Sequence, residues 1–127
     1  MGTILDQLAD YARVRVAKKK EEKPLEEIRE EALALAKAEP FRFERALGAP
    51  GDIHFICECK KASPSKGLIA PDFPYLEIAK QYELAGASAI SVLTEPKWFL
   101  GFDDYLREIA AEVQTPCLRK DFTVDPY

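Results

Sequence analysis

Between residues 53 and 122, short apolar segments alternate with amphipathic ones, and this alternation constrains the fold more than any other feature. Residues 53–60, 89–93 and 117–122 are short, apolar and rich in strand-forming side chains. The stretches between them repeat apolar residues at helical spacing. Strand–helix units of about 30 residues are typical of parallel βα folds, whose right-handed crossovers place the helices on one side. The pattern predicts an α/β protein, and it is compatible with either a barrel or a doubly wound sheet.

Two helices are predicted between these strands. The first follows Asp72, an expected N-cap, and ends at Gly86. The second spans residues 103–113 and places its apolar side chains on one face. Residues 62–67 and 94–101 have the composition of loops, and each follows the carboxyl end of a predicted strand.

The residues before the first strand predict two further amphipathic helices. Thr3 and Asp6 form a capping pattern, after which a helix is expected to run to about Lys20. Pro24 suits the first turn of a second helix, and Pro40 ends its apolar stripe.

Residues 1–47 are therefore interpreted as an N-terminal helical extension, and residues 48–127 as a parallel βα domain that is truncated after its third strand. A complete eight-stranded barrel needs about 250 residues, which is roughly twice this length. A three-stranded parallel sheet with open edges is an unusual finished product.

Composition excludes several classes of protein. The chain is 47% hydrophobic and 31% charged, which is typical of a globular domain. Its net charge of −4 gives no general attraction for nucleic acid or acidic membranes. It has no apolar run of the roughly 20 residues that span a bilayer, and its amino terminus lacks the pattern of a signal peptide. We expect a cytoplasmic protein with neither a nucleic-acid nor a membrane partner.

The three cysteines predict neither a disulfide nor a metal site. Their odd number argues against a disulfide framework. Cys57 and Cys59 lack the second pair of ligands that a zinc site needs, and Cys117 stands alone. We interpret all three as reduced side chains that behave as small hydrophobes.

Candidate functional residues lie at the carboxyl ends of the predicted strands, where parallel βα proteins carry their sites. Glu58 and Lys60 are two residues apart, so both side chains point to one face of the strand. Lys120 ends the third strand and is a candidate general acid. The alternative is structural: Glu58 and Lys60 would form an ion pair, and Lys120 would pair with Asp121 and reach solvent. Spacing alone leaves both interpretations open.

Other polar and aromatic residues give weaker signals. The segment that begins at Ser63 lacks the first glycine of a phosphate-binding loop. His54 stands early on the first strand, far from its carboxyl end, and is interpreted as structural. Trp98 and Phe99 could line a pocket for a flat substrate, or they could pack the loop against a helix.

Three ordered motifs resemble the indole-3-glycerol-phosphate synthase family. They are the E-x-K-x-x-S-P-S segment at residues 58–65, the S-V-L-T-E segment at residues 91–95 and the L-R-K-D-F segment at residues 118–122. The resemblance covers nearly the whole chain and includes the paired helices ahead of the first strand. It implies a (β/α)8 TIM barrel, of which this chain carries the first three strands after two N-terminal helices.

The resemblance also implies an activity. The family is a carbon–carbon lyase (a carboxy-lyase) of tryptophan biosynthesis. It closes the indole ring of 1-(2-carboxyphenylamino)-1-deoxyribulose 5-phosphate with loss of carbon dioxide and water, and it needs no metal or organic cofactor. By this likeness Lys120 is the proton donor to the ketone oxygen, Lys60 a second proton-transfer residue near the phosphate, and Glu58 the carboxylate that orients substrate and lysines. Ser63, Phe99 and Phe122 match the substrate-binding residues.

The family's further glutamate, asparagine and phosphate donors lie on later strands, so the 127-residue chain alone is expected to be inactive. Two alternatives remain open. The chain could be another sugar-phosphate-binding barrel such as phosphoribosylanthranilate isomerase, although the motif around Glu58 and Lys60 is not expected there. It could also be a noncatalytic half-barrel that self-associates through its open strand edges.

Overall fold

The computed structural model describes residues 2–35 and 39–127, and the chain forms two compact units. The larger unit is Phe41–Asp121. The smaller unit consists of the described residues up to Pro40 together with the segment Phe122–Tyr127.

Two helices form most of the smaller unit: α1 (Ile4–Glu22) and α2 (Leu25–Ala34). The predicted capping box is confirmed, because Asp6 N–H donates to Thr3 Oγ1 at 3.2 Å while Thr3 N–H donates to the Asp6 carboxylate at 2.7 Å. Of the predicted second helix, the part that falls on residues 36–38 lies outside the described residues. Over the described ranges, no helix is both long and apolar enough to cross a membrane.

The C-terminal segment is tied to the end of α1 by polar contacts. Tyr127 Oη donates to the carbonyl oxygens of Lys19 and Lys23 at 3.1 and 2.9 Å. Lys20 Nζ lies 2.7 Å from the Asp125 carboxylate, and this lysine and the N–H of Tyr127 hold the pKa of Asp125 below its ordinary value. The bond to Lys23 satisfies a carbonyl group at the C-cap of α1, whereas the carbonyl of Lys19 also accepts the N–H of Lys23.

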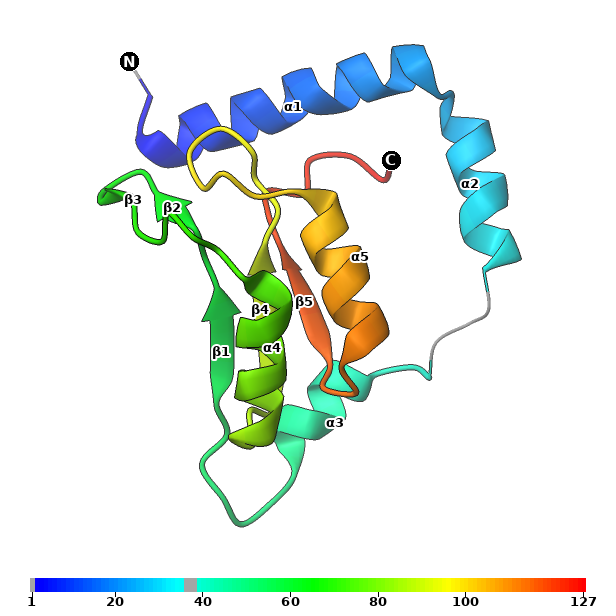
Figure 1. The fold of residues 1–127 in the computed structure, drawn as a ribbon. Coiled ribbons are helices and arrows are strands. Elements are labelled where there is room, and N and C mark those ends of the chain that lie inside the picture. Colours follow the sequence, from blue (N-terminus) through cyan, green and yellow to red (C-terminus); the bar gives the residue numbers. More distant parts are fainter. Residues whose placement is uncertain (1, 36–38) are drawn as a thin grey trace. The chain divides into compact units, whose positions relative to one another are not determined.

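The larger unit is built on a parallel sheet of three strands in the order β1–β4–β5 (Figure 1). The strands are β1 (Ile56–Cys59), β4 (Ala89–Leu93) and β5 (Cys117–Lys120). All three predicted strands are confirmed, with β1 and β5 shorter than predicted. Because the strands are parallel, their carboxyl ends meet at one edge of the sheet.

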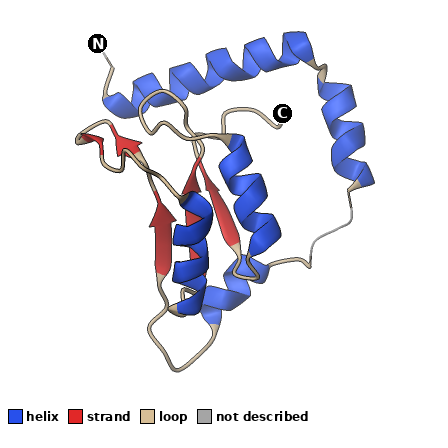
Figure 2. Ribbon diagram, in the orientation of Figure 1, coloured by secondary structure: helices blue, strands red, loops and turns tan. Residues whose placement is uncertain are grey.

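Helices α4 (Tyr75–Leu84) and α5 (Asp103–Glu112) cover one face of this sheet (Figure 2). The core between helices and sheet is apolar and consists of Cys59, Ala79, Ile90, Val92, Ile109 and Val113. Both predicted helices are confirmed, but the expected cap at Asp72 is wrong. Helix α4 begins only at Tyr75 and has no side-chain cap. Pro74 disfavours helical backbone at the residue before it, so the helix cannot start nearer to Asp72.

Three short elements of the larger unit were not predicted. Helix α3 (Arg42–Gly48) follows Phe41, whose φ is 59°. It has no capping side chain from which its start could be predicted. Strands β2 (Ala62–Ser63) and β3 (Gly67–Leu68) pair as a two-residue antiparallel ladder within the predicted loop. Elements of this length give too few residues for a periodic pattern.

Candidate functional site

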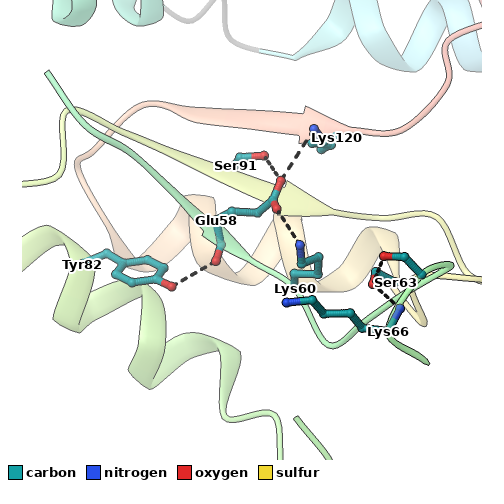
Figure 3. Close-up of polar contacts among 8 residues, drawn as sticks. Glu58, Lys60, Ser63, Lys66, Tyr82, Ser91 and Lys120 are labelled. Atoms are coloured by element: carbon teal, nitrogen blue, oxygen red, sulfur yellow. Dashed lines mark hydrogen bonds and ion pairs between the residues drawn. The ribbon is translucent and has the colours of Figure 1, made fainter. Parts of the chain in front are cut away.

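Charged and polar side chains from three strands meet at the carboxyl edge of the parallel sheet (Figure 3). Glu58 of β1 is the central residue. Its carboxylate lies 3.5 Å from Lys60 Nζ and 3.7 Å from Lys120 Nζ at the end of β5. Ser91 of β4, which is in register with Glu58, donates its hydroxyl to the same carboxylate at 3.2 Å. The parallel arrangement therefore brings together the three residues that the sequence singled out as catalytic.

The alternation of side chains along β1 determines which face carries this cluster. Cys59 is buried in the core beneath the helices, so its neighbours Glu58 and Lys60 point to the opposite face. The side chains of Glu58, Lys60 and Lys120 are 31%, 36% and 53% exposed. A polar substrate could therefore reach all three groups.

The cluster contributes little to the stability of the fold. Ion pairs with this exposure are worth about 0–1 kcal/mol each. Burial of one large apolar side chain contributes roughly 1.5–3 kcal/mol, and Ile90 and Ile109 are each 0% exposed. The core therefore holds the unit together, and the charged cluster can be changed without unfolding it.

The backbone beneath the cluster is held in place by α4. Tyr82 Oη donates to the carbonyl oxygen of Glu58 at 3.0 Å. Burial raises the pKa of Tyr82, so the phenol stays protonated and remains a donor near neutral pH. This bond links the helix layer to the strand position from which the carboxylate projects.

Ser63 follows β1 in the small β2–β3 ladder and is 7% exposed. Its hydroxyl accepts the backbone N–H of Lys66 at 3.2 Å and lies 3.5 Å from Ser65 Oγ. In this structure the hydroxyl organises the turn after β1, and either Ser63 or Ser65 can be the donor between the two hydroxyl groups.

The predicted aromatic residues lie in two parts of the chain. Trp98 and Phe99 are half-buried in the loop between β4 and α5. The larger unit ends at Asp121, and Phe122 is the next residue and belongs to the smaller unit. It is therefore not among the residues that the larger unit itself brings together.

Two polar residues of this region were missed. Ser91 is the polar member of the otherwise apolar strand β4, and this contrast could have identified it. Glu95 lies two residues after the end of β4 and is 1% exposed, and a charged side chain this deeply buried needs polar partners. Both lie inside the S-V-L-T-E motif, whose polar residues had no assigned role.

His54 has the structural contacts expected of it. Its Nε2 lies 2.7 Å from the carbonyl oxygen of Ala49 and its Nδ1 lies 3.1 Å from Ser88 Oγ, both away from the Glu58 cluster. Within the part of the chain that the structure describes, no three His, Cys, Asp or Glu side chains are grouped as a metal ion requires.

Fold and site together define a parallel βα protein with an acid–base cluster at the carboxyl edge of its sheet, which is where enzymes of this architecture carry their active sites. Comparison with known proteins identifies the family within this class. Residues 5–127 match the family model for indole-3-glycerol phosphate synthase, so the chain belongs to this family, whose fold is the TIM barrel.

Similar proteins carry the same description. The chain is 54% identical to the indole-3-glycerol phosphate synthase of Ruminiclostridium cellulolyticum, over 98% of this chain and 47% of that relative. It is 53% identical to the one from Endomicrobium trichonymphae and 48% identical to the one from Lacticaseibacillus casei, again over 98% of this chain and 48% and 47% of the relatives. The chain thus spans about half the length of these relatives. The family match favours the synthase over the isomerase alternative.

Proposed function

We propose that this chain supplies the first three strands of a (β/α)8 barrel that acts as an indole-3-glycerol-phosphate synthase. The barrel would convert 1-(2-carboxyphenylamino)-1-deoxyribulose 5-phosphate into indole-3-glycerol phosphate, carbon dioxide and water. The observation that carries the proposal is the convergence of Lys60 and Lys120 on the Glu58 carboxylate, at 3.5 and 3.7 Å, in a chain of this family.

Each charged residue has a role that its chemistry supports. Ring closure requires a carbon of the aromatic ring to attack a ketone, and negative charge develops on the ketone oxygen. Lys120 would donate a proton to that oxygen, and Lys60 would transfer a proton during the later loss of water. Glu58 lies within ion-pair distance of both lysines, so it can hold their ammonium groups near one substrate.

The remaining candidates would bind the substrate. Ser63 would donate its hydroxyl hydrogen to a polar group of the substrate, since its oxygen already accepts the N–H of Lys66 and its contact with Ser65 can be made with either hydroxyl as donor. Phe99 would lie against the aromatic ring, as expected for binding sites of flat ligands. By the family likeness, Phe122 is proposed as a further substrate-binding residue.

A fusion protein tests the proposal. The chain would be joined to the C-terminal part of the Ruminiclostridium cellulolyticum relative that it does not match, which restores the relative's length. We expect the fusion to form indole-3-glycerol phosphate. The substitution Lys120→Met should lower kcat by about 10²–10⁴-fold, the usual contribution of a general acid.

The matched control is Lys80→Met, which removes a lysine of α4 that pairs with Glu112 on the surface. This variant should keep full activity. Equal activity of the Lys120 and Lys80 variants would contradict the proposed role of Lys120. An inactive but folded unsubstituted fusion would contradict the proposed function itself.

We also propose that the isolated 127-residue chain does not catalyse ring closure, because the family likeness would place a further glutamate, an asparagine and the phosphate donors on strands that follow β5. The same assay with the purified chain tests this. Turnover at the rate of the fusion protein would refute it.

A second candidate is a half-barrel that self-associates. Strands β1 and β5 are the edges of the described parallel sheet, and apolar side chains at these strands are exposed: Phe55 by 61%, Ile56 by 50% and Leu118 by 41%. Exposed edges and apolar patches favour pairing between chains. Analytical ultracentrifugation of the purified chain decides: a dimer that dissociates on Ile56→Lys supports this candidate, and a monomer at high concentration contradicts it.

A further inference from the structure

The loop between β4 and α5, residues 94–101, is organised around a buried carboxylate that the proposed reaction does not use. Glu95 is 1% exposed. Its carboxylate accepts the backbone N–H groups of Lys97, Trp98 and Phe99 at 2.9, 2.7 and 3.0 Å. Three amide donors compensate for the loss of water around an ionised carboxylate, and bonds of this kind are stronger than those between neutral groups.

The conformation of this loop is also restricted at its other end. The N–H of Gly101 donates to the backbone carbonyl of Glu95 at 2.8 Å, which closes the loop on itself. Leu100 has a φ of 51°, a left-handed backbone that non-glycine residues adopt at a cost. Such a conformation persists only where surrounding contacts determine it. Here the residues on both sides of Leu100 are bonded to Glu95, Phe99 N–H to its carboxylate and Gly101 N–H to its backbone carbonyl.

The start of the loop is bonded to the end of β5, which carries a proposed catalytic residue. The N–H of Thr94 donates to the carbonyl oxygen of Lys120 at 3.1 Å. The Thr94 hydroxyl donates at 3.1 Å to the carboxylate of Asp121, whose side chain is fully buried. The loop and the Lys120 backbone therefore share one hydrogen-bonded junction.

We propose that Glu95 is a positioning residue, which fixes the backbone of residues 97–99 and so holds Phe99 in place as one wall of the substrate site. This inference rests on the proposed function in so far as Phe99 contacts the substrate. Glu95 itself would not touch the substrate, because its carboxylate is buried against the loop backbone.

The first experiment measures the loop directly in the 127-residue chain. Glu95→Gln leaves one acceptor oxygen and turns an NH2 group toward the amide donors. Amide hydrogen exchange by NMR at residues 97–99 should become about ten- to hundredfold faster, which corresponds to the loss of bonds to a charged acceptor. The fluorescence of Trp98, the chain's single tryptophan, should change in the same variant.

Two further variants make the comparison specific. Glu95→Asp keeps the charge but shortens the side chain by one methylene group, so it should restore part of the protection. Glu112→Gln removes an exposed carboxylate at the end of α5 and should leave residues 97–99 unchanged. Exchange at residues 97–99 that is no faster in the Glu95→Gln variant than in this control would overturn the proposal.

The second experiment separates positioning from a merely structural role, using the Glu95→Gln substitution in the fusion protein described above. A displaced aromatic wall should raise KM by about tenfold, the value of one ordered aromatic contact, while kcat falls less because Lys120 and Glu58 keep their places. A structural role alone would reduce the amount of folded enzyme and leave KM unchanged, and that result would also overturn the proposal. If the unsubstituted fusion is inactive, the proposed function fails, and the exchange data still decide whether Glu95 holds the loop.

Discussion

The substitution of Gly101 by alanine should destabilise the larger unit strongly, because the structure leaves no room for a methyl group there. A Cβ atom at Gly101 would lie 2.3 Å from the carbonyl oxygen of Leu93, 2.7 Å from its carbonyl carbon and 2.8 Å from the carbonyl carbon of Thr94. All three are backbone atoms at the end of β4, and Leu93 and Thr94 are only 3% and 2% exposed.

The magnitude follows from what would have to move. Overpacking a buried site costs about 1–3 kcal/mol when side chains can adjust. Here the obstacle is the backbone of the central strand, which is hydrogen-bonded to β1 on one side and β5 on the other. We therefore expect a loss near the upper limit, about 3 kcal/mol. With a urea m-value of about 1.5 kcal/mol/M for a small domain, the midpoint of unfolding should fall by about 2 M.

Urea titration followed by far-UV circular dichroism and by the fluorescence of Trp98 measures this change. The matched control is Gly48→Ala in α3, where a Cβ would meet nothing within 4 Å. The same chemical change should leave the free energy of unfolding unchanged there or raise it by up to about 1 kcal/mol, because alanine has a higher helix propensity than glycine. Midpoints for the two variants that agree within the error of the titration would refute the reasoning.

Two further predictions concern ionisable groups of the larger unit. Hydrogen bonds from the Thr115 side chain and backbone and from Gln114 N–H hold the pKa of Glu83 below its ordinary value of 4.5. The ionised Glu83 carboxylate therefore stabilises the folded state fully above pH 4.5, and this stabilisation is lost as the pH falls through the folded-state pKa. Glu83→Gln should lower the urea midpoint at neutral pH and flatten its decline in acid, and parallel pH profiles for both proteins would argue against this. Burial raises the pKa of Cys59 to about 11, so iodoacetamide at neutral pH should alkylate this thiol only after the chain unfolds. Peptide mass spectrometry measures the labelling, and rapid alkylation of Cys59 in the folded chain would contradict the prediction.

Much of the fold could be predicted from local patterns. Strand β4, Ala89–Leu93, was predicted to the residue because all five of its side chains are buried and the segment is continuously apolar. Helices α1, α4 and α5 followed from apolar residues at helical spacing. The error at Asp72 shows the limit of this approach: a capping residue is only a local preference, and the proline two positions later overrode it.

The sequence by itself determined which residues are polar at the ends of strands and that Glu58 and Lys60 share one face of β1, because side chains alternate along a strand with a period of two. Only the tertiary structure decided that Lys120 reaches the Glu58 carboxylate, that Ser91 donates to it, and that Glu95 folds back onto three backbone amides. The first two contacts depend on strand order and register, which are settled by packing between segments far apart in the chain. The third depends on how the 94–101 loop closes through backbone bonds, which the side-chain pattern does not specify.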